Sequence, residues 1–454
     1  MLSIPAVQTS LGKYVTKRIN DDYGTNINIG RVGLQFNGDV ELKEVYIEDY
    51  KKDTLIAAGE INTSILNYRN IINGTLNFGD IDVMNLTFNV RTYKDETETS
   101  LDVFVAKFDE DNPRLEKSTF FLSSSDVSIY DGKFRLIDEN RETQKILEFY
   151  DLNINATNFI IDGSDVRTRI NTLVLKDSRG AYVKNMMTDF EYTLSHMTFN
   201  DLSIKTEKSL LKGDLRFDYN REDLADFEDK VQVTANFRDS EVFLNDLNTF
   251  YNEFGNNQKA DLSVKLTGTL NNLNAENLQL NTSTRTSIYG DLNFKNLFDN
   301  SEENKFSMNG KFTNLSSNYY DLRALLPNIL GASIPSVFSK LGNFKITGTS
   351  YITESTIEAN IKINTVLGLI LSDMRMTQVD DIDNAKYVGN IVFDAFDLGV
   401  LLNNPKVKTT SFDLDVDGRG FTIDNLSTQV TGEVFHLDYN YYNYQNVDIS
   451  GKLG

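Results

Sequence analysis

Apolar and polar residues alternate along most of this chain from residue 27 onward, and this pattern constrains the fold more than any other feature. A clear example surrounds an Asn37-Gly38 pair, with Val32 and Leu34 before it and Val40 after it. Successive side chains of a β-strand point to opposite faces, and Asn-Gly is a strong hairpin signal. The pattern therefore predicts a hairpin here and a succession of strands, each with one apolar and one polar face.

Composition agrees with a β-rich fold. The 454 residues include 29 Phe and 21 Tyr but only 5 Pro, so strand-forming residues are plentiful and strand breakers are few. Around Gly79-Asp80 the phase of the alternation changes, which predicts a bulge or tight turn at that point. The chain is long enough for several domains or for one extended architecture.

Charge and side-chain chemistry exclude several function classes. Lys and Arg number 45 against 66 Asp and Glu, a net charge of −21 that repels nucleic-acid phosphates. Cys is absent and His occurs only twice, which excludes disulfides, thiol catalysis and Cys- or His-rich metal sites. We expect no nucleic-acid partner, no catalytic residues, no metal and no cofactor.

The first 20 residues are predicted to form a membrane-proximal amphipathic helix. After Pro5, a residue favoured early in helices, Val7, Leu11, Val15 and Ile19 recur at four-residue steps. Such a helix can cap the end of a sheet, lie near a membrane, or do both. No run of 18 apolar residues follows, so no bilayer-spanning helix is expected in this chain.

Short helical signals repeat in the second half of the chain. Asp246-Leu247, Asp321-Leu322 and Asp397-Leu398 each open a brief segment, and the three aspartates are spaced by 75 and 76 residues. A Gly-containing strand signal follows each, at Gly268, Gly348 and Gly418. The pattern predicts repeated units of strand, short Asp-capped helix, loop and strand. We expect residues 21–230 to form a first part of the sheet and 231–454 to form these repeats.

A further sequence similarity links a segment of the first half of the chain to a segment of the second half. Leu202-x-Ile204 followed by Gly213-Asp214-Leu215-x-Phe217 resembles Leu278-x-Leu280 followed by Gly290-Asp291-Leu292-x-Phe294. The alternation predicts that the apolar residues of such segments share one face of the sheet. The candidate residues for this apolar lining are Val83, Leu86, Phe88, Val127, Ile129, Leu202, Ile204, Leu215, Phe217, Leu278, Leu280, Leu292 and Phe294.

An apolar sheet face must be covered, and the sequence contains no long amphipathic helix after residue 20 that could cover it. The sheet can pack on itself as a sandwich, close as a barrel, or curl into a trough that is filled from outside. An open apolar trough would expose more apolar surface than soluble monomers tolerate, and acyl chains would bind there. We expect an elongated, curled, antiparallel or mixed sheet.

The chain resembles the N-terminal part of TamB-type translocation and assembly proteins of Bacteroidota, within the AsmA-like superfamily. The resemblance covers essentially the whole chain and rests on a diffuse pattern, with no diagnostic catalytic motif. It is carried by the residues Ile4-Pro5-Ala6-Val7-Gln8-Thr9, Asp53-Thr54-Leu55-Ile56, Gly268, Gly348, and the stretch from Asp321-Leu322 through Leu326-Pro327 to Ile334-Pro335.

The resemblance implies a non-enzymatic, inner-membrane-anchored periplasmic bridge whose taco-shaped β-trough carries phospholipids between the two membranes and supports outer-membrane assembly. It also implies an N-terminal anchor and a C-terminal domain that engages an outer-membrane barrel of the TamA/BamA type. Neither is found in this sequence, so we expect a fragment of a longer protein. Lipid identity and transport direction are not implied.

Three acidic stretches have ordinary structural interpretations. Asp413, Asp415, Asp417 and Gly418, with Asp424, match the spacing of an EF-hand loop, but the flanking residues alternate as a strand. Asp109-Glu110-Asp111 and Asp380, Asp381 and Asp383 are expected to lie in solvated loops, and His196 and His436 in ordinary strand positions.

A rival hypothesis is a closed β-sandwich that acts as a surface adhesin or glycan-binding protein. Its support is the Tyr- and Asn-rich stretch from Tyr439 to Tyr444, where aromatic and amide groups could contact sugars. An edge strand with alternating Tyr explains the same stretch equally well.

Overall fold

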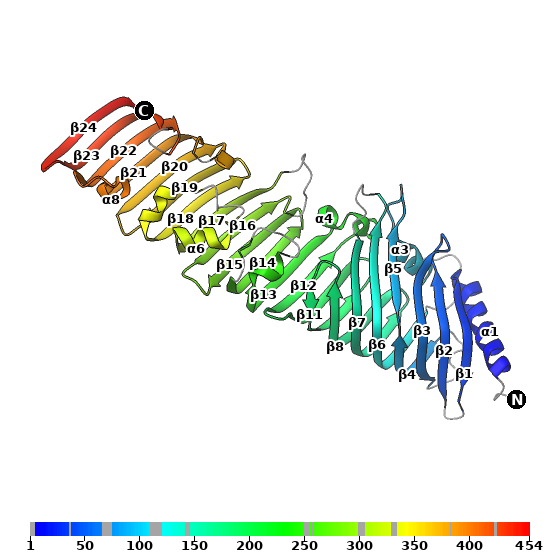
Figure 1. Cartoon of the computed structure of the whole chain (residues 1–454). Helices are drawn as coiled ribbons and strands as arrows, with labels where there is room; N and C mark the ends of the chain where they lie inside the picture. The colour runs from blue at the N-terminus through cyan, green and yellow to red at the C-terminus, as the bar shows by residue number, and fades with distance from the viewer. Residues whose placement is uncertain are drawn as a thin grey trace. The chain divides into compact units, whose positions relative to one another are not determined.

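The computed structural model describes residues 5–35, 38–65, 75–108, 120–140, 146–248, 254–255, 258–297, 305–327, 334–381, 383–421 and 425–454. It divides into two compact units, Met1–Ala235 and Asn236–Gly454 (Figure 1). We call them the first and the second unit and describe each by itself. Both consist mainly of strands joined by short connections, so the predicted mainly β class is confirmed.

The first unit begins with a helix and continues with strands that are interrupted by short helical segments. Its helices are α1 (Pro5–Tyr23), α3 (Ser100–Val105), η1 (Ala106–Phe108), η2 (Arg221–Asp226) and α4 (Phe227–Lys230). Its strands are β1 (Ile27–Leu34), β2 (Asp39–Glu48), β3 (Thr54–Ile65), β4 (Thr75–Met84), β5 (Thr87–Thr92), β6 (Phe121–Asp138), β7 (Ile146–Asp162), β8 (Asp165–Asp177), β9 (Tyr182–Val183), β10 (Asn185–Tyr192), β11 (His196–Lys205) and β12 (Leu210–Asp218), and β13 (Gln232–Phe243) starts at its end.

Most strand pairs of the first unit are antiparallel. The predicted hairpin is present, since Leu34 pairs with Val40 between β1 and β2, although Asn37 lies outside the described residues. β4 and β5 both pair parallel to β6, because the chain crosses from β5 through α3 and η1 before it returns as β6. The register between β3 and β4 shifts beside Gly79-Asp80, as the change of phase predicted.

Helix α1 packs along β1 and hydrogen-bonds to it. The Gln8 Nε2 donates to the Leu34 carbonyl at 2.8 Å, and the Asn20 side chain bonds both the N–H and the carbonyl of Ile27 at 2.8 and 2.9 Å. Val32 likewise donates its N–H to the Thr9 hydroxyl at 3.3 Å. The helix therefore satisfies backbone groups at an edge strand, one way in which proteins protect a sheet edge. The side chains of Val7, Leu11 and Val15 lie outside the described ones.

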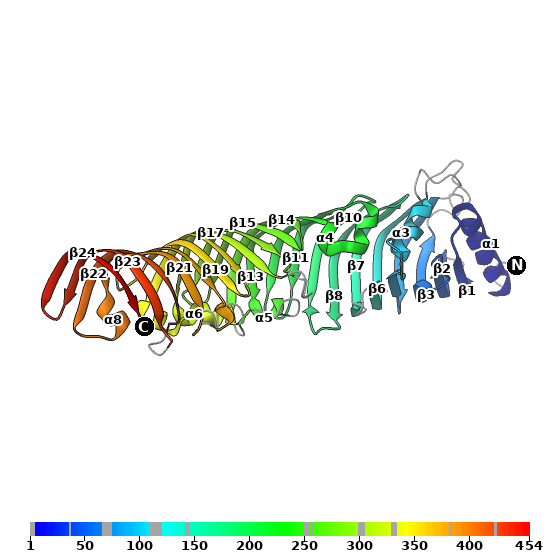
Figure 2. The same cartoon turned by 90° about the horizontal axis from the view of Figure 1, so that it is seen from above.

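The second unit takes in the rest of β13 and an antiparallel succession of strands from β14 to β24. Its strands are β14 (Lys259–Thr269), β15 (Asn272–Thr282), β16 (Ser287–Lys295), β17 (Ser307–Asn318), β18 (Asn343–Thr353), β19 (Thr356–Asn364), β20 (Leu369–Thr377), β21 (Lys386–Asp397), β22 (Val407–Arg419), β23 (Ser427–Tyr439) and β24 (Tyr442–Leu453). Its helices are α5 (Leu244–Leu247), α6 (Tyr319–Leu325), η3 (Ser336–Leu341), η4 (Val379–Asp381) and α8 (Leu398–Leu402). Figure 2 shows the strands of this unit arching over α6 and α8.

The predicted repeat of short helices is present, since α5, α6 and α8 directly follow β13, β17 and β21. The predicted aspartate cap is right only for α8, where Asp397 accepts the N–H of Val400 at 3.1 Å. In α6 the cap is Asn318, which accepts from Asp321 at 2.9 Å, and α5 has no side-chain cap. An aspartate at the third helical position stabilises the helix through its dipole instead.

The sequence similarity between the two halves corresponds to one repeated β-bulge. In the first unit, Asp201 adopts a φ of 50°, and the next residue, Leu202, pairs with Gly213 across the ladder. The carboxylate of Asp214 then accepts the Asp201 N–H at 3.0 Å. The second unit repeats the arrangement with Asn277 (φ 52°), Leu278, Gly290 and Asp291, whose carboxylate accepts the Asn277 N–H at 2.9 Å. The shared residues therefore build a shared local structure.

Candidate functional site: the apolar face of the sheet

An unbroken row of apolar residues crosses the second unit. Directly paired residues in an antiparallel sheet point to the same face, so the register defines the row. It takes one residue from each strand from β14 to β24, in the order Leu262, Leu280, Ile288, Leu315, Ile346, Ile363, Ile370, Phe393, Phe412, Val434 and Val447. At about 4.8 Å per strand, the row measures about 48 Å.

Two further rows on this face contain small residues over β17 to β21. One consists of Gly310, Ser350, Ala359, Met374 and Gly389, and its neighbour of Phe312, Gly348, Ile361, Ser372 and Ile391. On their other side a row of large residues follows, with Met308, Ile352, Ile357, Met376 and Tyr387. A strip in which six of ten residues are Gly, Ala or Ser therefore lies between two rows of large apolar side chains.

Short helices cover part of this face. At β20 to β23 they help form a buried cluster in which Phe396 is 0% exposed. Phe338 and Leu341 of η3 and Leu398 and Leu401 of α8 pack against this cluster. A second cluster surrounds Val264, Ala275 and Leu278 near β14 to β16.

Over β17 to β20 most apolar side chains of this face are only partly buried, although Leu315 and Ile370 are buried. The partly buried set comprises Met308, Phe312, Ile346, Ile352, Ile357, Ile361, Met374 and Met376, none of which belongs to either of these two clusters. Contiguous apolar surface that is not fully buried is typical of a binding face. The strip of small residues crosses this same stretch.

The candidates predicted in β14 to β16 gather in one place. Leu280, Leu292 and Phe294 pack around buried Leu278, and Leu280 also belongs to the row that crosses the unit. In the first unit Val83 pairs with Ile129, and Val127 lies on the same face. Phe88 contacts Phe134 with ring centroids 5.5 Å apart, and Leu86 lies in the short link between β4 and β5.

The four candidates of β11 and β12 also share a face, but part of it is covered. Leu202 is 3% exposed, and Ile204 and Leu215 are half buried. The Phe217 ring lies 6.2 Å from Phe199 and 5.2 Å from Phe227 of α4, within a buried cluster around Tyr192 and Val231. Phe217 therefore contributes to a packed core.

The strand expected at Asp413 to Asp417 is present, whereas the solvated loop expected at Asp380 and Asp381 is a short 3-10 helix with both side chains exposed. Asp413, Asp415 and Asp417 lie on the exposed face of β22, and Asp424 is outside the described residues, as are Asp109 to Asp111. Asp380 and Asp381 belong to η4. Over the described ranges, no group of three or more acidic or His side chains could hold a metal ion.

The two histidines and the Tyr-rich stretch lie in hairpins. His196 Nε2 is 3.6 Å from the Glu191 carboxylate, and His436 Nε2 is 3.2 Å from the Asp438 carboxylate. Tyr442 and Tyr444 alternate along β24 with ring centroids 4.7 Å apart.

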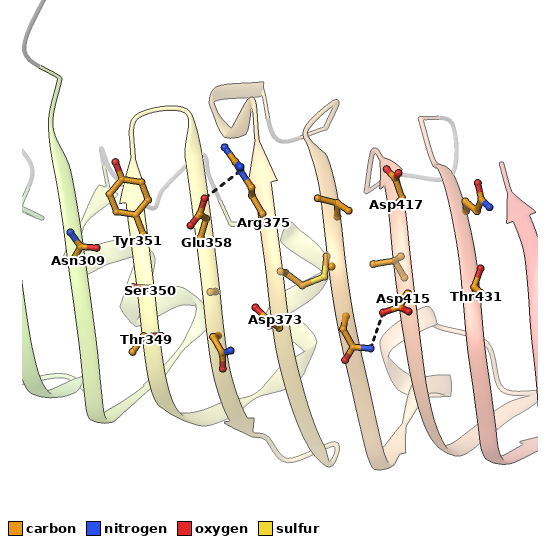
Figure 3. Close-up of a pocket in the computed structure, with 18 residues that line it drawn as sticks. Asn309, Thr349, Ser350, Tyr351, Glu358, Asp373, Arg375, Asp415, Asp417 and Thr431 are labelled. Carbon is orange, nitrogen blue, oxygen red and sulfur yellow. Dashed lines mark hydrogen bonds and ion pairs between the residues drawn. The ribbon is translucent and has the colours of Figure 1, made fainter.

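Sequence reasoning missed a hollow on the opposite, polar face of the second unit. It has a volume of about 910 Å³ and is lined by residues of seven strands, β17 to β23 (Figure 3). Its walls are two rows of side chains. One row contains Asn309, Tyr351, Glu358, Arg375, Val388, Asp417 and Gln429, and the other contains Thr349, Asn360, Asp373, Asn390, Asp415 and Thr431. No local motif signals it, because each strand supplies only one or two of these residues.

No model of a known protein family matches this sequence, and no curated protein matches it significantly. Within the described ranges, no helix is long and apolar enough to cross a membrane. The two faces of the sheet are therefore the evidence for function.

Proposed function

We propose that this protein is a non-enzymatic lipid carrier, whose apolar sheet face holds phospholipid acyl chains. The observation that supports this most is the row of eleven apolar residues from Leu262 to Val447, which no polar residue interrupts. An acyl chain needs apolar contact along its whole length. The row supplies such contact where the short helices and the packed clusters leave it uncovered, over β17 to β20.

The strip of small residues is the place for the acyl chain on this face. Over β17 to β20 it runs between Met308, Ile352 and Ile357 on one side and Leu315, Ile346 and Ile363 on the other. A chain of methylene groups in this strip would contact both rows of large side chains. Each buried methylene contributes about 0.8 kcal/mol, so acyl chains bind firmly without any specific residue.

The uniform apolar lining of this face also favours movement of an acyl chain along it. Neighbouring strands present similar apolar side chains at intervals of about 4.8 Å, so a chain that shifts by one strand exchanges one set of contacts for a similar one. The barrier between such positions is small because little contact is lost at any step. Transfer between inner and outer membranes, and the outer-membrane barrel partner, remain predictions from the family resemblance.

A transfer assay tests this proposal. The chain is added to donor vesicles with a fluorescent phospholipid and to unlabelled acceptor vesicles, and the rate of transfer is measured. Ile361→Asp places a charge in the strip and should reduce the protein-dependent rate at least tenfold. Ala359→Phe should reduce it too, because it fills the strip without adding a charge.

The matched control is Asn360→Asp, which adds the same charge on the same strand but on the opposite face. It should leave transfer unchanged. Circular dichroism of each variant establishes that the sheet is retained. Equal transfer by Ile361→Asp, Ala359→Phe and the unaltered chain would contradict the proposal.

A further inference from the structure

The polar hollow of the second unit has no part in the lipid proposal. It lies on the reverse of the strip of small residues, because its floor is the backbone of Ser350, Ala359, Met374, Gly389 and Val416. The two rows of polar side chains form its walls and cross seven strands (Figure 3). At about 4.8 Å per strand, this corresponds to a length of about 29 Å. The volume of about 910 Å³ is in the range of binding sites.

The polar groups of this hollow are available to a ligand. Within the part of the chain that the structure describes, eight polar side chains of its walls have no hydrogen bond or ion pair to another side chain: Asn309, Thr349, Tyr351, Asn360, Asp373, Asp417, Gln429 and Thr431. Four other side chains of the walls are held in place by two interactions. Arg375 lies 3.3 Å from the Glu358 carboxylate, and Asn390 donates to Asp415 at 3.1 Å.

The polar face of the first unit is different. There Asn155 donates to the Asp126 carboxylate at 3.0 Å and to the Ser128 hydroxyl at 3.2 Å. Asn171 in turn donates to Asn155 at 3.0 Å. These side chains satisfy one another, whereas most of the described polar side chains in the walls of the hollow have no partner side chain. The side chains of the hollow can therefore bond to a ligand without breaking contacts within the protein.

The chemistry of the walls suits a ligand rich in hydroxyl groups. Amide side chains donate and accept, carboxylates accept, and the Thr349 and Thr431 hydroxyls do both, so adjacent hydroxyls of a sugar find partners. Tyr351 adds an aromatic ring with a polar tip, which can contact the apolar side of a sugar ring. Four carboxylates and one guanidinium line the hollow, so an anionic ligand is repelled.

We infer that this hollow binds a non-anionic oligosaccharide that lies across the strands. The repeat of polar side chains from strand to strand matches a ligand whose hydroxyls recur along a chain. The proposal is independent of lipid binding, since the two ligands occupy opposite faces of the same strands.

Isothermal titration calorimetry of the full chain tests the inference. The probes are cellohexaose, maltohexaose, a chitosan hexamer and, as the anionic comparison, hexagalacturonate. At least one of the first three should bind with one molecule per chain, and hexagalacturonate should bind at least tenfold more weakly. Asn360→Ala and Asp373→Asn should each weaken binding at least tenfold.

Asn293→Ala is the matched control, because Asn293 lies on the same polar face in β16, outside the hollow, and hydrogen-bonds to Asn272 and Asn274. It should bind the probe as the unaltered chain does. Absence of binding by all three non-anionic probes, tighter binding of hexagalacturonate, or unchanged affinity in both hollow variants would overturn the inference. Lipid transfer by Asn360→Ala should remain normal, so a failure here is distinguishable from a failure of the lipid proposal.

Discussion

Two neighbouring regions of the second unit share one alternating pattern yet differ in what covers them. Around β21 to β23, η3 and α8 pack on the apolar face, and Phe393, Phe396 and Phe412 are buried. Over β17 to β20, equally apolar residues such as Ile357 and Ile361 are only partly buried. Alternation therefore dictates a sheet with one apolar face, whereas the short helices decide where that face becomes a core. The uncovered region is the one that we assign to acyl chains.

The largest loss of stability is expected from a substitution in the covered region, where η3 and α8 pack on β21 to β23. Phe396 is 0% exposed and its ring centroid lies 4.2 Å from that of Phe393. Phe396→Ala should lower the free energy of unfolding by about 3–5 kcal/mol, because it removes buried surface and leaves a cavity. Urea denaturation measures the change. A loss below about 1 kcal/mol would mean that this region is no core.

The second largest loss of stability is expected from a side chain at Gly432, where the backbone conformation favours glycine. Gly432 has a φ of 148°, and a Cβ atom built there would lie 2.2 Å from the Asp413 carbonyl of β22. Gly432→Ala should cost about 1–3 kcal/mol, the usual strain of such a conformation. Gly451 in β24 has nothing within 4 Å of its Cβ position, so Gly451→Ala is the control and should be nearly neutral. Equal thermal stability of the two variants would contradict the described register.

A smaller effect is expected in the uncovered region. Ile361→Ala should cost about 1 kcal/mol, since a half-buried side chain gains roughly half of what full burial contributes. Urea denaturation under the conditions used for Phe396→Ala gives the comparison. If Ile361→Ala cost as much as Phe396→Ala, the uncovered region would be as closely packed as the covered one, and little room would remain for a lipid.

Removal of the carboxylate that stabilises the repeated bulge should have a similar or smaller effect. Asp291→Ala leaves the Asn277 N–H without its acceptor and should cost up to about 1 kcal/mol. Asp261, an exposed residue of β14, serves as the control, and Asp261→Ala should change stability little. Thermal denaturation of both variants measures the difference. Indistinguishable melting temperatures would show that Asp291 does not stabilise the bulge.

The smallest expected change in stability depends on pH and comes from Asp177, a buried carboxylate of the first unit. Burial acts to raise the pKa of Asp177, but hydrogen bonds from Arg179 at 2.7–2.9 Å outweigh it and hold that pKa below its usual range. A depressed pKa contributes stability above the unfolded pKa that is lost as the pH falls through the folded one.

The stability of the unaltered chain should therefore approach that of Asp177→Asn as the pH falls below the usual titration range of an aspartate. Chemical denaturation at several pH values measures this convergence. A constant difference between the two proteins as the pH falls would contradict the assigned charge pair.

Much of this architecture follows from the sequence alone. Alternation predicted the strands, the similarity around Leu202 and Leu278 marked equivalent positions, and the spacing of Asp246, Asp321 and Asp397 located three short helices. These features depend on residues close together in the chain. Local patterns suffice for them because each strand buries one face in the same way.

Other features depend on distant segments and were missed. The sequence did not predict that Phe227 of α4 would pack against Phe217, nor the parallel pairing of β4 and β5 with β6. The left-handed conformations of Asp201 and Asn277 become evident only when Gly213 and Gly290 are placed opposite the following leucines. Likewise the polar hollow exists only once seven strands are in register.

Native mass spectrometry of the chain purified without added lipid tests the central claim most directly. The unaltered protein and Asn360→Asp should carry several phospholipids per chain, identified after extraction, whereas Ile361→Asp should carry few or none. A lipid-free mass for the unaltered protein, or equal lipid content in all three, would contradict the account of the apolar face as an acyl-chain carrier.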